Sequence, residues 1–97
     1  MANIPNFSAM TKDELMSFWS RYSRPRRKDA EELIGDRRKG FTTLSGDIAA
    51  YACNLAVAKG CREEGKLDSA EIYDYSVKLS FDRLPPDIQA EIQRSQQ

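Results

Sequence analysis

The feature that most constrains this chain is an apolar run near its middle, from Ile48 to Ala58, which only Asn54 interrupts with a polar side chain. A helix that is apolar on nearly every side needs neighbours on several sides. Small side chains also recur three or four positions apart through this region: Ala49, Ala52, Cys53, Ala56 and Gly60. The pattern predicts a central helix over residues 43–64 that its neighbours can approach closely.

The length and composition of the chain fit one small domain built around that helix. Ninety-seven residues can bury a hydrophobic core without a metal ion or a disulfide. Apolar residues make up 40% of the chain and charged residues 31%, as expected for a small body with much surface. We expect a single domain over 1–97 with an irregular arm at 1–9, whose Ile4 and Phe7 pack on the body, and a frayed end at 95–97.

Capping and breaking signals place a first helix after the arm. Thr11 and Glu14 match a capping box, in which each side chain bonds the backbone N–H of the other residue. Pro25 disfavours helical geometry at the residue before it, so the helix should end near Tyr22 or Ser23. It carries one apolar stripe at helical spacing, made of Leu15, Phe18, Trp19 and Tyr22.

A second helix is predicted over residues 26–39, with Gly35 weakening its middle and Gly40 closing it. Its apolar residues are few, namely Ala30, Leu33 and Ile34. We therefore expect it to be mostly solvated surface.

The central helix should turn back into a fourth helix. Gly65 is placed to end the former and Asp68 to cap the latter, with Glu71 completing a second capping pattern. Because the connection is short, the two helices should form an antiparallel hairpin. We assign six residues to the inner face of the fourth helix: Ile72, Tyr73, Ser76, Val77, Ser80 and Phe81.

A last short helix over residues 87–94 follows Pro85 and Pro86 and is anchored by Ile88 and Ile92. No segment combines alternating apolar residues with β-branched enrichment, so no sheet is expected. The sequence therefore predicts an all-α fold, a compact bundle of four to five helices around a central apolar helix at about 43–64. Helices three and four form its antiparallel hairpin.

Within that hairpin, Ala58, Gly65 and Ala70 resemble small-residue positions of the tetratricopeptide repeat. Cys61 and Asp74 stand where that family prefers aromatic residues, and at most one repeat is covered, so the chain is not assigned to it. The resemblance implies only a helical hairpin that presents a surface to partners.

Composition argues against most catalytic and metal sites. The chain has no histidine, the commonest general base and zinc ligand. Cys53 and Cys61 are eight residues apart on one predicted helix, about 12 Å along its axis, and cannot pair. We expect no enzyme activity, no cofactor and no metal, a location in the reducing cytoplasm, and no membrane span, because the apolar run is too short.

Two weaker patterns are better explained without a ligand. Gly40 and Gly46 precede or open a helix as in a phosphate loop, but no Gly-Lys-Ser/Thr follows, so we interpret the segment as a helix start. Asp29, Glu32 and Asp36 could converge on a hard cation. Basic residues four positions away suggest surface ion pairs instead.

One candidate surface is a basic segment at residues 21–39, which contains eight basic residues and four acidic ones. Its side chains could contact phosphates, with the Tyr22 ring available for stacking. The acids within the segment argue for a solvated, ion-paired helix instead. The candidate nucleic-acid contacts are Arg21, Arg24, Arg26, Arg27, Lys28, Arg37, Arg38 and Lys39.

The other candidate surface is aromatic. Tyr73 and Tyr75 should point about 200° apart around their helix, so one of them faces a partner or solvent. The candidate partner residues are Tyr22, Tyr51, Tyr73 and Tyr75. We predict a non-enzymatic protein–protein interaction or regulatory domain that binds itself or another protein; the alternative is a nucleic-acid-binding accessory protein using residues 21–39.

Overall fold

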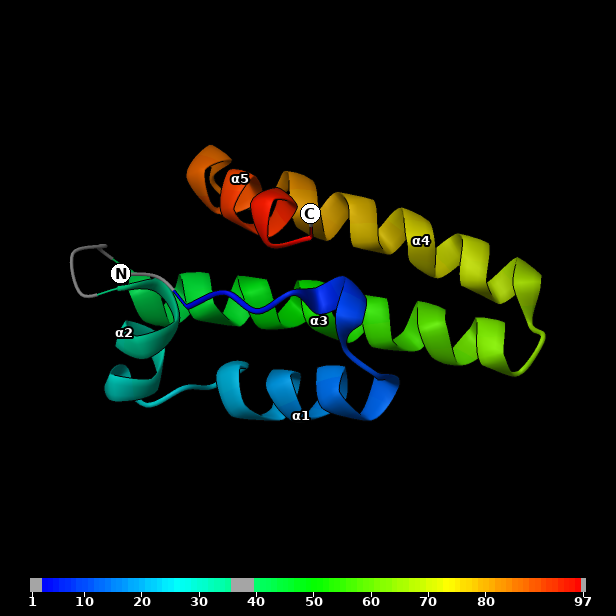
Figure 1. The fold of residues 1–97 in the computed structure, drawn as a ribbon, viewed down its shortest axis with the longest axis horizontal. Helices are drawn as coiled ribbons and strands as arrows, with labels where there is room; N and C mark the ends of the chain where they lie inside the picture. The colour runs from blue at the N-terminus through cyan, green and yellow to red at the C-terminus, as the bar shows by residue number, and fades with distance from the viewer. Residues whose placement is uncertain (1–2, 36–39, 97) are drawn as a thin grey trace.

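The structure, a computed structural model, describes residues 3–35 and 40–96, and it is helical almost throughout these ranges (Figure 1). No strand occurs in them. In chain order the elements are a 3₁₀ turn, η1 (Phe7–Ala9), and the helices α1 (Lys12–Tyr22), α2 (Arg27–Ile34), α3 (Phe41–Glu63), α4 (Leu67–Asp82) and α5 (Pro86–Ser95). The predicted all-α bundle is confirmed.

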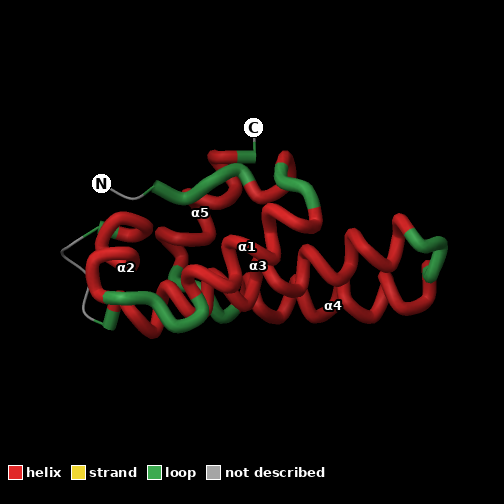
Figure 2. The backbone as a smooth tube through the Cα atoms, turned by 90° about the horizontal axis from the view of Figure 1, so that it is seen from below, coloured by secondary structure: helices red, strands yellow, loops and turns green. Residues whose placement is uncertain are grey.

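Helix α3 lies at the centre, between α1 on one side and α4 on the other, with α2 packed near its start (Figure 1). Ile48, Ala49, Ala52 and Ala56 of α3 are 0% exposed. The predicted central helix is therefore confirmed, although it begins earlier, at Phe41. Seen from below, the free end of the α3–α4 hairpin extends past the rest of the chain (Figure 2).

A series of aromatic rings links the outer elements through the core. Phe7 of η1 lies edge-on to Phe18 of α1 and to Tyr51 of α3, with ring centroids 5.0 and 5.6 Å apart. Tyr22 extends the series on α1 and Phe81 extends it on α4. Edge-on aromatic pairs stabilise a core beyond the area that they bury. The N-terminal arm is thus part of the core, and its expected anchor at Phe7 is confirmed.

The N-terminal arm is hydrogen-bonded to α2 on one side and to α5 on the other. The backbone N–H of Asn3 donates to the Leu33 carbonyl at the end of α2 (2.8 Å), and Ser95 Oγ of α5 donates to the Ile4 carbonyl (3.4 Å). Ile4 also packs against the core. These bonds hold the two ends of the chain against one body.

The turn between α3 and α4 follows from one glycine. Gly65 has φ +76°, a left-handed conformation that glycine adopts without penalty. Its N–H donates to the Arg62 carbonyl (3.1 Å) and the N–H of Lys66 donates to the Cys61 carbonyl (2.8 Å), which is a Schellman arrangement. The antiparallel hairpin is as predicted, but the cap is not: Lys66 occupies the N-cap position and Asp68 lies inside the first turn.

Two polar contacts fix how α4 lies along α3. Asn54 Nδ2 donates to Ser80 Oγ at 2.6 Å, and Arg62 pairs with Asp74 nearer the turn. Asn54, the one polar residue in the apolar run, therefore has its partner on the neighbouring helix. An α4 shifted along its axis would lose both contacts.

Helix α2 is shorter than predicted. It ends at Ile34, because Gly35 takes φ +87° and closes it, rather than weakening its middle. The predicted remainder, residues 36–39, lies outside the described ranges. Helix α1 begins and ends as predicted: Thr11 and Glu14 form the expected capping box and Ser23 is the C-cap. The last helix is also as predicted, with Ile88 and Ile92 buried.

The assignment of the inner face of α4 needs two corrections, because Tyr73 is 37% exposed and Ile72 is exposed further still. Ile72 is 66% exposed and points away from the core. The inward positions are Ala70, Val77 and Phe81, of which Ala70 is only 2% exposed. Ile72 is two residues from Ala70, about 200° around the helix, so the two cannot share a face.

Candidate interaction surface on α4

The outer face of α4 carries an apolar stripe, which we define as Ile72, Tyr75 and Leu79. Their exposed fractions are 66%, 63% and 42%. The three are spaced three and four residues apart, so they lie on one face of the helix. That face is turned away from the side that packs on α3, where α4 forms one edge of the layer made by α1, α3 and α4 (Figure 1).

Charged residues border the stripe in a regular way. Asp68 continues it toward the start of α4 and Asp82 continues it toward the end, so acids limit its length. Glu71 and Lys78 are seven residues apart and lie on the same flank of the stripe, and both are exposed. Neither Glu71 nor Lys78 forms an ion pair with any residue that the structure describes. Two opposite charges on one flank are thus available to a partner.

The four tyrosines of the predicted partner surface lie in different environments. Tyr75 is on the stripe, which confirms that one of Tyr73 and Tyr75 faces outward, and Tyr73 is 37% exposed on another side of α4. Tyr22 is half-buried, with its ring against Phe18 and under the Arg21 guanidinium. Tyr51 contradicts the prediction, because it is 6% exposed within the core. Burial raises the pKa of its hydroxyl, and a hydrogen bond with Gln96 opposes that rise.

The basic segment is held largely by the acids within it. Arg26 Nε lies 3.0 Å from Asp29 Oδ2, and Arg21 reaches both Asp29 and Glu32 at 3.3 Å. The Asp29 side chain is only 9% exposed. Its hydrogen bond with Arg26, and then that with Arg21, lower the pKa of its carboxyl although burial opposes the shift. Four charges that the sequence offered to phosphates or to a cation, on Arg21, Arg26, Asp29 and Glu32, are therefore paired with one another.

The rest of that segment divides into two groups. Arg27 pairs with Glu31 at 3.0 Å, while Arg24 and Lys28 are exposed. The predicted contacts Arg37, Arg38 and Lys39 lie outside the described residues, as does Asp36 of the cation hypothesis.

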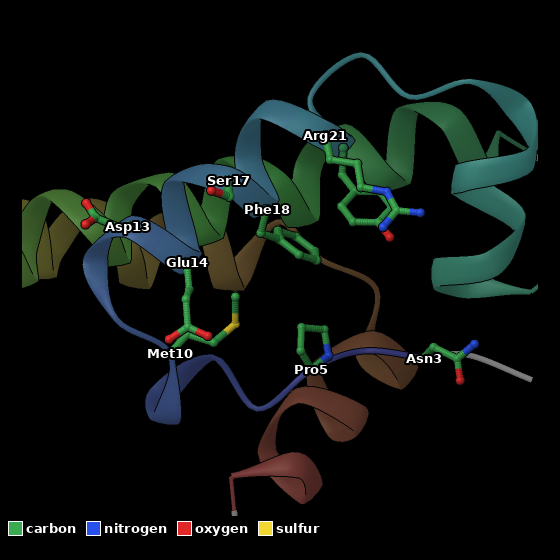
Figure 3. A pocket seen from close by; sticks show the side chains of 9 residues that line it. Asn3, Pro5, Met10, Asp13, Glu14, Ser17, Phe18 and Arg21 are labelled. Atoms are coloured by element: carbon green, nitrogen blue, oxygen red, sulfur yellow. The ribbon is translucent and has the colours of Figure 1, made fainter.

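A groove runs between the N-terminal arm and α1, with a volume of about 570 Å³ (Figure 3). The Phe18 ring points into it, Pro5 borders it from the arm, and Arg21 lies at one end (Figure 3). Two of its charged groups are already bonded: Glu14 completes the α1 cap and Arg21 is ion-paired. The backbone hydrogen bond with Thr11 lowers the pKa of Glu14.

Within the described ranges, no three histidine, cysteine, aspartate or glutamate side chains gather closely enough to hold a metal ion. Cys53 and Cys61 are free and half-buried on α3. None of the helices in residues 3–35 and 40–96 combines the length and the apolar character that a bilayer crossing requires.

Comparisons with protein-family models, with curated proteins and with solved structures find no match to this chain. Any functional inference therefore depends on the surfaces described above.

Sequence reasoning found Tyr75 but missed its neighbours Ile72 and Leu79, and it did not single out Glu71 and Lys78. The signal was present, because residues 72, 75 and 79 follow helical spacing as well as the inward residues do. Two apolar stripes on one helix, with one neighbour to cover them, imply that one stripe stays exposed.

Proposed function

We propose that this chain is a small helical protein–protein interaction module that docks through the apolar stripe Ile72, Tyr75 and Leu79. The observation that carries the proposal is the exposure of all three on one face of a helix whose other face is core. Isolated exposed apolar residues are ordinary on a protein surface, whereas an aligned group is typical of a binding site.

The chemistry of the stripe suits recognition of another helix. Anchors at positions i, i+3 and i+7 are the pattern by which amphipathic helices are recognised. Tyrosine is enriched at interfaces because its ring supplies contact area and its hydroxyl stays hydrated. Neighbouring charges on Glu71 and Lys78 supply the polar rim that sets orientation.

The test places a photo-crosslinking amino acid at Tyr75 in the full chain, expressed in its native cell. Ser20, exposed on α1, is the matched control position. We expect protein adducts from position 75 in excess of those from position 20, and we expect Ile72→Ser in the same chain to reduce them. Equal labelling at the two positions would refute the proposal.

Nucleic-acid binding through residues 21–39 is the alternative, and the ion pairs of Arg21, Arg26 and Arg27 lower its support. Fluorescence anisotropy with generic DNA and RNA at low salt tests it. Binding that weakens steeply as salt rises, and again when Arg24 and Lys28 become alanine, would favour the alternative.

A further inference from the structure

Building on the proposed docking function of the stripe, we infer that its partner is a second copy of this chain, with the two α4 helices antiparallel about a twofold axis near Tyr75. In this arrangement Glu71 of each copy faces the partner's Lys78. The pairing is isologous, so every contact occurs twice.

The spacing of the apolar stripe matches such an axis. A twofold axis at Tyr75 sets residues at equal distances before and after it against each other. Ile72 is three residues before Tyr75 and Leu79 is four after it, so each isoleucine meets the partner's leucine with an axial offset of about 1.5 Å. The two tyrosines meet at the centre, where their rings can offset and keep their hydroxyls in water.

The flanking charges specify antiparallel rather than parallel pairing. In an antiparallel twofold pair, each flank of the helix meets the same flank of the partner. Glu71 lies four residues before the axis and Lys78 lies three after it, so each glutamate comes opposite the partner's lysine. Two opposite-charge pairs result. In a parallel pair the same flank would face Ser69 and Ser76, and neither charge would gain a partner.

The acids at the ends of the stripe limit the strength of the pair. Antiparallel pairing places Asp68 near the partner's Asp82 at each end, which confines the apolar contact to three residues per chain. Helix α4 has 16 residues, about 24 Å, so the buried area falls below that of a standard stable interface. We expect a reversible dimer with a Kd on the order of 100 µM.

Sedimentation equilibrium of the full chain from about 10 µM to 1 mM tests self-association in the range such a weak pair implies. Ile72→Ser should abolish the dimer, while Leu67→Ser should leave it unchanged, since Leu67 is 68% exposed but lies off the stripe. Asp82→Lys should tighten the dimer by about tenfold, because it replaces a repulsion with an attraction at both ends. Circular dichroism and thermal unfolding verify that each variant is folded.

A charge exchange tests the geometry. Glu71→Lys and Lys78→Glu should each weaken self-association by about tenfold at low salt, because each creates two like-charge contacts. An equimolar mixture of these two variants should form a heterodimer at least as tight as the unmodified dimer, since both pairs are then opposite in charge.

Three results would overturn the inference: a monomer at 1 mM, a dimer that survives Ile72→Ser, or a mixture that associates no better than its separate components. A monomer whose position 75 still crosslinks to a different protein overturns the inference but leaves the proposed function standing. Equal crosslinking at positions 75 and 20 overturns both.

Discussion

The two helices of the hairpin, α3 and α4, differ in how far their apolar residues are buried. Helix α3 is apolar on nearly every side and has α1, α2 and α4 packed against it, so that Ile48 is fully buried. Helix α4 has two apolar faces but packs mainly against α3, and Ile72 stays 66% exposed. The comparison teaches that the number of neighbouring helices decides which apolar residues become core and which remain available to a partner.

The largest predicted effect compares these two isoleucines directly. Ile48→Ala should lower the free energy of unfolding by about 2–5 kcal/mol, because it removes buried atoms and leaves a cavity at the centre of the bundle. Ile72→Ala should change it by no more than about 0.5 kcal/mol in dilute, monomeric protein. Urea unfolding at low micromolar concentration measures both, and similar losses for the two variants would contradict the distinction.

The next effect concerns the turn that joins the two helices. A β-carbon at Gly65 would touch nothing within 4 Å, so Gly65→Ala isolates the strain of its left-handed backbone. We expect a loss of about 1–2 kcal/mol in unfolding free energy.

Gly46→Ala is the matched control for that turn. Gly46 lies inside α3, and its added carbon would sit 3.4 Å from the Ser23 carbonyl, an ordinary contact. This substitution should stabilise the chain by up to about 1 kcal/mol, because alanine favours a helix interior. Effects of opposite sign on the unfolding free energy would show that backbone conformation, not space, distinguishes the two glycines; losses at both would contradict this account.

A smaller effect tests the polar contact between α3 and α4. Asn54→Ala and Ser80→Ala, alone and combined, form a double-mutant cycle around the 2.6 Å hydrogen bond. The expected coupling is about 0.5–1.5 kcal/mol, as for a partly buried neutral hydrogen bond. A coupling near zero would mean that Asn54 does not help to fix how the helices align.

The central helix and the first cap could be predicted because each depends on residues near in sequence. An apolar run without a polar face leaves a helix no alternative to burial, and the Thr11–Glu14 box is closed within four residues. The end of α2 was misplaced for a different reason. A glycine inside a helix and a glycine that ends one look alike in sequence, and only the positive φ of Gly35 separates them.

The face of α4 that binds α3 was beyond local reasoning. Residues 70, 77 and 81 and residues 72, 75 and 79 both follow helical spacing. The choice between them depends on the crossing with α3, where small Ala70 permits close approach and Ser80 meets Asn54. For the same reason Tyr51 could be assigned to a surface although its ring lies in the core. The candidate site was therefore only partly predictable.

Charges show the same contrast between α2 and α4. On α2, Asp29 is nearly buried and receives both Arg21 and Arg26, so these three charges are satisfied within the chain. On α4, Glu71 and Lys78 have no such partner among the described residues. Arg21 and Arg26 of the basic segment thus join α1 to α2 through Asp29, whereas Glu71 and Lys78 of α4 remain available to a partner.

The smallest predicted effect tests the ion pairs of Asp29 with Arg21 and Arg26 through the pH dependence of stability. Because its hydrogen bonds with the two arginines lower the pKa of Asp29 in the folded chain, Asp29 adds stability above its ordinary value of 3.8. That stability is lost as pH falls through the lowered pKa.

Asp29→Asn should therefore unfold at lower urea concentration than the unmodified chain at pH 7, and the two curves should converge toward pH 2. The matched control is Asp47→Asn, at an exposed carboxyl with no ion pair to the described residues, and it should unfold at the same urea concentration as the unmodified chain at pH 7. If Asp29→Asn did the same, the ion pairs on α2 would be solvated surface, and the basic segment would again be open to an external partner.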